Sequence, residues 1–299
     1  MEHNTVYRRF CNYLKVDPAT ITELDQIPFL PIQFFKEFKV VASEDAVQTV
    51  FTSSGTTGSI TSKHHVTDLD LYEKSFRESF KLHYGAIEDY TVLALLPSYL
   101  ERDGSSLIYM VDCLIKASKK PDSGFYLNDY NALSEKLKRL DAAGEKVLLI
   151  GVSFALLDLV ELFEFKLKNT IVMETGGMKG RRKELIREEL HAILKEGFGV
   201  AEIHSEYGMT ELLSQGYSNG NGIFTNPPWM QVFMRDTEDA LNYVAPGKTG
   251  GINVIDLANH YSCPFIATQD LGKKLDENRF EILGRFDTSD IRGCNLMVL

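Results

Sequence analysis

Short apolar runs alternate with amphipathic stretches through the middle of the chain. Continuous runs of aliphatic residues predict buried strands, whereas apolar positions three and four residues apart predict helices. The expected strands cover 91–96, 147–150, 170–173 and 200–204, and the expected helical stretches cover 105–117, 154–165 and 181–195. The alternation predicts units of strand and helix around a sheet, so the expected fold class is α/β.

The pattern changes toward both ends of the chain. Residues 1–48 contain three prolines and a group of phenylalanines, so we expect an N-terminal helical cap there. An α/β core is expected over 49–228. Beyond it, 229–299 should form a smaller β-rich lobe, because glycines separate strand-like pieces with few helical signals between them. The pieces expected to be strands in this lobe are 251–257, 265–268 and 280–283.

Composition and charge narrow the functional classes. Hydrophobic residues at 44% and charged residues at 25% are typical of a packed globular protein and exclude a disordered chain. The net charge of −10 argues against a nucleic-acid partner, because phosphate binding relies on clustered Lys and Arg. No segment approaches the roughly 20 apolar residues of a membrane span. Four cysteines without CxxC pairing predict reduced thiols, a cytoplasmic protein and no structural zinc.

A hydroxyl-rich loop offers the first candidate site. Its glycines allow close approach of the backbone to phosphate oxygens, and its hydroxyls add donors without fixing a charge. It is not a Walker loop, because Ser59 and Ile60 stand where Lys and Ser or Thr are needed. Alone it could equally be a surface turn. The residues of this candidate phosphate loop are Thr52, Ser53, Ser54, Gly55, Thr56, Thr57 and Gly58.

A second motif, Ser205-Glu206-Tyr207-Gly208-Met209-Thr210-Glu211, follows the strand expected at 200–204. Together and in this order, the two motifs resemble the TSGTTG loop and the YGxTE element of the adenylate-forming enzymes. That superfamily includes acyl-CoA ligases, nonribosomal-peptide adenylation domains and luciferases. The resemblance implies their large N-terminal domain, with mixed sheets flanked by helices plus a smaller β-rich lobe, and without the usual C-terminal domain.

The resemblance also implies roles for individual residues, with ATP and Mg²⁺ as cofactors. Tyr207, beside Gly208, would stack on adenine, Thr210 would contact the α-phosphate, and Glu211 would help hold Mg²⁺. A flat ring suits a base, and a hard carboxylate oxygen suits magnesium. The alternative is a tight turn with a buried tyrosine.

Two later pieces resemble further elements of the superfamily. Thr268-Gln269-Asp270 resembles the TGD element, which implies that Asp270 binds the ribose hydroxyls, although Gln269 replaces the usual glycine. In Gly284-Arg285-Phe286-Asp287, Arg285 resembles the hinge-region arginine that also reaches the ribose, and Asp287 the hinge residue. Either Arg285 or Asp287 could instead belong to a surface ion pair.

Two more stretches narrow the resemblance. Residues 95–102 and 174–180, the latter with Gly176 and Gly177 as candidate nucleotide contacts, resemble the acyl-protein synthetases of bacterial luminescence fatty-acid reductase complexes. This likeness covers about 49–299, and residues 1–48 add little to it. It implies activation of a fatty or other carboxylic acid, transfer of the acyl group to a cysteine, and a reductase subunit or acyl carrier protein as partner.

Cys294 is the candidate acyl acceptor in this resemblance. A thiolate attacks an acyl-adenylate readily, and the neighbouring Arg292 could favour its formation. The apolar end of the sequence could instead make Cys294 an inert core thiol. The lysine that the superfamily's C-terminal domain supplies is either dispensable, contributed by a partner, or replaced. Its candidate replacements in this chain are Lys63, Lys179 and Arg285.

Other functions remain open alternatives at this point. Gly151-Val152-Ser153-Phe154-Ala155 imitates the nucleophile elbow of a serine hydrolase, but Ala155 stands where the sharp turn needs glycine. We therefore expect this segment to line the acyl pocket. The rival functions are an acyl-CoA or acyl-carrier-protein ligase, in which Cys294 is structural, and a non-catalytic nucleotide-binding partner of a reductase.

Overall fold

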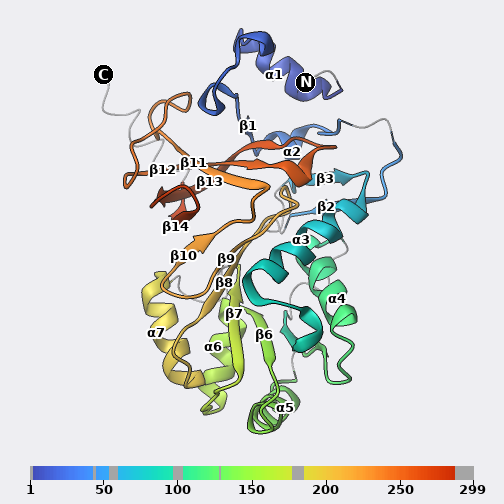
Figure 1. The fold of residues 1–299 in the computed structure, drawn as a ribbon, viewed down its shortest axis with the longest axis vertical. Helices are drawn as coiled ribbons and strands as arrows, with labels where there is room; N and C mark the ends of the chain where they lie inside the picture. The colour runs from blue at the N-terminus through green and yellow to red at the C-terminus, as the bar shows by residue number, and fades with distance from the viewer. Residues whose placement is uncertain are drawn as a thin grey trace.

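One large mixed sheet dominates the protein (Figure 1). The structure is a computed structural model that describes residues 3–42, 45–53, 60–96, 104–127, 129–176 and 185–286. Within these ranges the sheet has 12 strands in the order β11-β12-β13-β14-β10-β9-β8-β7-β6-β4-β5, and β1 pairs with β13. The expected α/β class with mixed strands flanked by helices is confirmed.

Five neighbouring strands of this sheet run parallel. They are β5 (Gly124–Phe125), β4 (Thr91–Leu95), β6 (Val147–Val152), β7 (Thr170–Thr175) and β8 (His204–Tyr207). Every residue of β4 and β6 is buried, as expected for strands that are covered on both faces. The helices around this half are α3 (Leu69–Tyr84), α4 (Ser106–Ser118), α5 (Tyr130–Ala142), α6 (Ser153–Leu162) and α7 (Arg187–Phe198).

The other half of the sheet is antiparallel from β8 onward. Its strands are β9 (Gly216–Ser218), β10 (Ile223–Thr225), β11 (Met230–Arg235), β12 (Thr249–Asp256), β13 (Phe265–Lys274) and β14 (Arg279–Arg285). Short 3-10 helices, η3 (Ile87–Asp89) and η4 (Leu257–Asn259), lie before β4 and after β12. The apolar side chains of this half form a second hydrophobic core, separate from the first and larger core around the parallel strands.

The N-terminal segment packs on the antiparallel half. It contains α1 (Thr5–Tyr13), η1 (Pro18–Thr20), η2 (Leu24–Gln26), β1 (Leu30–Pro31) and α2 (Phe34–Glu37). Tyr7, Cys11 and Phe35 from this segment belong to the second core, and β1 pairs in parallel with β13. The first residues of the chain are thus joined to the sheet by both packing and backbone hydrogen bonds.

Most of the expected elements are present. The strands expected at 91–96, 147–150, 170–173, 251–257, 265–268 and 280–283 correspond to β4, β6, β7, β12, β13 and β14. The strand expected at 200–204 is misplaced, because β8 begins only at His204. Gly199 ends α7 in a left-handed conformation, and the Val200 amide still bonds to Lys195, so this stretch belongs to the helix cap.

A separate hairpin of β2 (Thr49–Thr52) and β3 (Lys63–Val66) carries the candidate phosphate loop. Phe51 anchors it, with its ring centroid 5.4 Å from Tyr72 on α3 and 5.6 Å from Tyr109 on α4. None of the helices in the described ranges is both long and apolar enough to cross a membrane.

Candidate functional site

The base of the candidate phosphate loop is closed by paired backbone. Thr52 pairs with Lys63 across the hairpin. The Ser53 amide donates to the Ser62 carbonyl at 3.1 Å, and the Ser62 amide donates to the Ser53 hydroxyl at 2.9 Å. The Thr52 amide donates to the Gly104 carbonyl at 2.7 Å. Gly104 has φ +83°, and a Cβ there would lie 2.9 Å from the Val50 carbonyl, so glycine is required. The remaining loop residues, 54–58, lie outside the described ranges.

Three of the candidate site residues, one each from β8, β13 and β14, contact one another, although β9 and β10 separate β8 from β14 in the sheet. The Tyr207 hydroxyl donates to one carboxylate oxygen of Asp270 at 2.8 Å, and Arg285 Nε contacts the other at 3.1 Å. Asp270 and Arg285 are register partners on β13 and β14. The side chain of Asp270 is 8% exposed, whereas that of Arg285 is 79% exposed. A buried carboxylate therefore joins a buried phenol to an exposed guanidinium.

The Tyr207 ring packs against two other aromatic rings. Phe224 and Phe280 lie 6.1 and 6.0 Å away in edge-to-face geometry. Burial raises the pKa of Tyr207 well above its usual value, and the neighbouring Asp270 carboxylate adds to this effect. The hydroxyl consequently remains a hydrogen-bond donor to Asp270, and the ring plane is fixed.

The turn after β8 contains Thr210 and Glu211. The Glu211 side chain is buried, and burial raises its pKa. Ser62, at the base of the phosphate loop, and the positive charges of Arg285 and Lys36 oppose this effect and lower the pKa. Glu211 therefore lies against the phosphate-loop hairpin.

Gly208, at the start of the same turn, lies close to the buried Glu206 side chain. A Cβ at this position would lie 2.4 Å from Glu206 Oε1. Glu211 is the one candidate metal ligand that the sequence indicated. The described part of the chain contains no cluster of three or more His, Cys, Asp or Glu able to hold a metal. Any cation bound by Glu211 would therefore need other ligands, such as phosphate oxygens or water.

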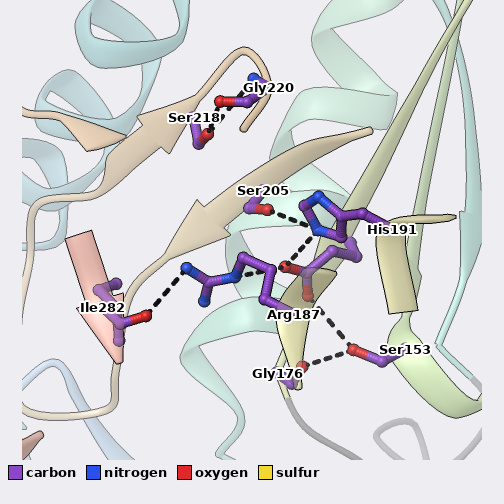
Figure 2. Close-up of polar contacts among 9 residues, drawn as sticks. Ser153, Gly176, Arg187, His191, Ser205, Ser218, Gly220 and Ile282 are labelled. Atoms are coloured by element: carbon purple, nitrogen blue, oxygen red, sulfur yellow. Dashed lines mark hydrogen bonds and ion pairs between the residues drawn. The ribbon is translucent and has the colours of Figure 1, made fainter. Parts of the chain in front are cut away.

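The end of β7 is held by a buried polar network around Glu174 (Figure 2). The Ser153 hydroxyl donates to the Gly176 carbonyl at 2.8 Å and to Glu174 at 3.2 Å. His191 Nε2 and Arg187 Nε lie 3.6 and 3.9 Å from the same carboxylate. Arg187 also donates to the Ile282 carbonyl at 3.2 Å, which links α7 to β14. Gly176, with φ +70°, is thus fixed where the strand ends.

This network also bears on the hydrolase alternative. Ser153 is 2% exposed and contacts Glu174 rather than a histidine. His191 Nε2 faces both Ser205 and Glu174, so the ring does not connect a serine to a carboxylate through its two nitrogens. Ser153 therefore positions the end of β7 and does not form a triad with these residues.

Sequence reasoning missed several polar residues of the site, among them Ser62, Glu174, Arg187 and His191. Glu174 had a usable signal, because it is a carboxylate at the end of a strand of apolar residues. Arg187 and His191 had no such signal, because they belong to a charged stretch whose pattern predicts a solvent-exposed helix.

Several candidate residues cannot be placed in the site. Gly177, Lys179, Asp287, Cys294 and the stretch 97–102 lie outside the described residues. Lys63 is exposed at the base of the phosphate loop. The described cysteines, Cys11, Cys113 and Cys263, are free thiols whose pKa values burial raises.

The sheet and the helices around it share the fold of the large domains of adenylate-forming ligases. ATP-bound MatB from Rhodopseudomonas palustris superposes with a TM-score of 0.60 and 19% identity, over 81% of this chain and 49% of its own. A 2-hydroxyisobutyryl-CoA ligase superposes with a TM-score of 0.67 and 13% identity, over 96% of this chain and 66% of its own. The chain thus spans about half to two thirds of these proteins, and the likeness concerns the fold.

The chain belongs to the acyl-protein synthetase family, LuxE, whose family model matches residues 1–71 and 120–299. The long-chain-fatty-acid–luciferin-component ligase of Vibrio harveyi is 25% identical over 98% of this chain and 82% of its own length. The expectation that residues 1–48 add little to the likeness is wrong, because the family match includes them. The chain is therefore an acid–thiol ligase, an enzyme that activates a carboxylic acid with ATP as an acyl-adenylate.

Proposed function

We propose that the chain activates a long-chain fatty acid as its acyl-adenylate and transfers the acyl group to a protein thiol. The observation that carries this proposal is the hydrogen-bonded group of Tyr207, Asp270 and Arg285. These residues come from three separate motifs, yet they meet beside the turn that contains Thr210 and Glu211. A bound nucleotide needs ligands for its base, its ribose and its phosphates close together, as in this arrangement.

Each half of the nucleotide has candidate ligands. Asp270 accepts the ribose hydroxyls, Arg285 reaches the same sugar, and Tyr207 presents its fixed ring to adenine. Gly176 and Gly177 contribute backbone beside the base. The phosphate loop from Thr52 to Gly58 holds the pyrophosphate group through amides and hydroxyls.

The chemistry is a substitution at phosphorus. A carboxylate oxygen of the acid attacks the α-phosphorus, the bond to the bridging oxygen breaks, and pyrophosphate leaves. Thr210 orients the α-phosphate, and the loop stabilises the departing charge. Positioning and charge stabilisation by fixed donors supply most of the rate enhancement in such reactions.

Glu211 is the proposed Mg²⁺ ligand. Mg²⁺ commonly takes one or two carboxylates and completes its shell with phosphates and water, so a single buried carboxylate suits it. Bound there, Mg²⁺ would neutralise phosphate charge. The buried carboxylate has a raised pKa, so a cation beside it would also favour its ionised form.

The family and its relatives support the proposed acid and the proposed acceptor. The Vibrio harveyi relative is named as a long-chain-fatty-acid ligase, and the family is described as acyl-protein synthetases. We propose Cys294 as the residue that carries the acyl group, and a reductase subunit or an acyl carrier protein as its recipient. Coenzyme A as acceptor is the rival.

The test is release of pyrophosphate by the purified chain with ATP, Mg²⁺ and acids of graded length. Release should require the acid and should be greatest with long chains. Formation of acyl-CoA on addition of coenzyme A would identify a CoA ligase. Tight ATP binding with no acid-dependent pyrophosphate, even with a reductase partner present, would falsify the enzymatic proposal and favour a nucleotide-binding partner.

A further inference from the structure

The turn that contains Thr210 and Glu211 is held by three fully buried side chains. His64 Nδ1 lies 2.8 Å from the Thr210 carbonyl oxygen, and Asn259 Nδ2 donates to the Glu211 carbonyl at 2.6 Å. Asp256 accepts the amides of Leu213 and Ser214 at 2.8 and 3.0 Å. His64, Asp256 and Asn259 each have 0% exposure. Both carbonyls of the Thr210–Glu211 pair and the amides that follow are thus fixed by side chains from elsewhere.

The chemistry of the His64 contact determines which ring nitrogen carries a proton. A carbonyl oxygen can only accept, so Nδ1 must be the donor. Burial lowers the pKa of His64 to about 4, so the ring is neutral near pH 7. Phe35 packs against it in edge-to-face geometry at 5.4 Å, which fixes the ring orientation. His64 therefore holds the turn without placing a charge next to it.

The positions of these side chains connect separate parts of the site. His64 follows Lys63 on β3, the strand that closes the phosphate loop. Asn259 lies on η4, between β12 and β13, and β13 carries Asp270. A hydrogen bond from each therefore ties the turn to the loop on one side and to the ribose-binding strand on the other.

We propose that His64 and Asn259 are positioning residues that aim the Thr210 hydroxyl and the Glu211 carboxylate at the nucleotide, an inference that rests on the proposed function. Neither residue contacts the reacting atoms. Each fixes one peptide carbonyl, and side chains on a fixed peptide have fewer directions available. Asp256 holds the far end of the same turn in place.

Two variants of His64 that resemble it in shape distinguish a positioning role from a general contribution to stability. An asparagine amide can occupy the place of imidazole Nδ1, whereas a glutamine amide occupies that of Nε2. His64→Asn should keep the donor to Thr210, and His64→Gln should lose it. In acid-dependent exchange of pyrophosphate into ATP, His64→Gln should lower kcat by ~10- to 100-fold, with the KM for ATP changed less than threefold. His64→Asn should stay within about threefold of the wild type in kcat.

His83→Gln is the matched control. His83 Nδ1 bonds to a carbonyl, that of Ser79, at the same 2.8 Å, but within α3 and away from the turn. Both variants should lower the melting temperature, and the His83 variant should keep its kcat. Wild-type kcat in His64→Gln, equal losses in His64→Asn and His64→Gln, or an equal loss in His83→Gln would overturn the inference.

A wild-type chain with no acid-dependent exchange would disprove the proposed function and leave the His64 bond to be decided separately. The ring ¹⁵N shifts of His64 and the backbone amide resonances of 209–213 then supply the readout. A neutral ring protonated at Nδ1, with amide shifts in His64→Gln but not in His64→Asn, supports the inference. A ring protonated at Nε2, or unshifted amides, overturns it.

Discussion

At the scale of single residues, Asp270 holds the candidate ribose site together. Among the described residues, each of its carboxylate oxygens has one hydrogen-bond partner, Tyr207 or Arg285, and each oxygen has capacity to accept a further hydrogen bond. Two acceptors on one rigid strand are suited to the two hydroxyls of a ribose. The buried tyrosine and the ion pair, which the sequence offered as alternatives to a binding role, are both features of this arrangement.

Replacing Asp270 with asparagine should weaken nucleotide binding. The amide removes one acceptor and the charge that pairs with Arg285, so we expect the KM for ATP in pyrophosphate release to rise by ~10-fold, a loss of about 1.4 kcal/mol. Asp276→Asn is the control, because Asp276 pairs with Arg279 Nε at 2.6 Å in the same lobe and is exposed. Equal effects of the two substitutions on the KM would contradict a ribose-binding role for Asp270.

Residues with distinctive chemistry in short motifs were the part of the site that the sequence could indicate. Tyr207, Asp270 and Arg285 were each identified from their own motif, and the structure brings them into contact. His64 belongs to none of these motifs. Its partner Thr210 is 146 residues away, and a contact at that separation depends on the fold, which a motif does not contain.

At the scale of elements, β8 shows how a strand that is buried on both faces affects its polar residues. Ser205 and Tyr207 point to one face, and Glu206 points to the other. The only hydrogen bond described for the Glu206 carboxyl comes from the Thr175 hydroxyl, at 2.5 Å. Burial, and to a lesser degree the charge of Glu174, raises the pKa of Glu206 to about 7.

This raised pKa predicts a pH-dependent stability. Below the unfolded pKa of 4.5 the carboxyl is protonated in both the folded and the unfolded chain, and its contribution to the free energy of unfolding is fully present. As the pH rises toward 7, the unfolded chain ionises first, so stability is lost, by about 3 kcal/mol in all. Glu206→Gln should lack this loss, and its stability relative to the wild type should increase between pH 5 and pH 8.

Urea unfolding at several pH values measures this difference. Glu135→Gln, an exposed change on α5, is the control and should follow the wild-type pH dependence. A Glu206→Gln variant whose stability parallels the wild type from pH 5 to pH 8 would show that the carboxyl is ionised in the folded protein.

The elements that could be predicted were those with a strong local pattern. The buried runs of β4 and β6 and the apolar periodicity of α4 are visible in the sequence. The two-residue strands β1 and β5 are too short to show any period. β5 pairs with the edge strand β4, and β1 pairs with 266–267 of β13, a part of that strand that β14 leaves unpaired. Their formation depends on pairing rather than on propensity.

At the scale of the whole molecule, one sheet connects the parallel and antiparallel halves. Along the sheet, the parallel pairing ends at β8 and the antiparallel pairing begins between β8 and β9; Tyr207 is the last residue of β8, and the turn of 208–211 follows it directly. The site therefore lies where the two halves and their two hydrophobic cores meet. A change of pattern near residue 229 was visible in the sequence, but the continuity of the sheet across it was not, because strand order is not encoded locally.

The proposed acyl transfer also belongs to this scale, because the proposed acceptor, Cys294, and the residues proposed to hold the adenylate lie in different parts of the sequence. Burial raises the pKa of Cys11, Cys113 and Cys263, and a thiol kept protonated is a poor nucleophile. We therefore expect Cys294 to carry the acyl group. After incubation with ATP, Mg²⁺ and a long-chain acid, intact-mass analysis should show one acyl adduct that hydroxylamine removes.

Cys294→Ala should abolish this adduct and leave acid-dependent pyrophosphate release within about twofold, because adenylation precedes the attack by the thiol. Cys113→Ala is the matched control, since Cys113 is the least buried of the described cysteines, and it should retain the adduct. An adduct that survives Cys294→Ala and disappears in Cys113→Ala would assign the acceptor to α4. If neither the wild type nor the control forms an adduct while acyl-CoA accumulates with coenzyme A, the thiol acceptor is external, and the chain transfers the acyl group directly from the adenylate.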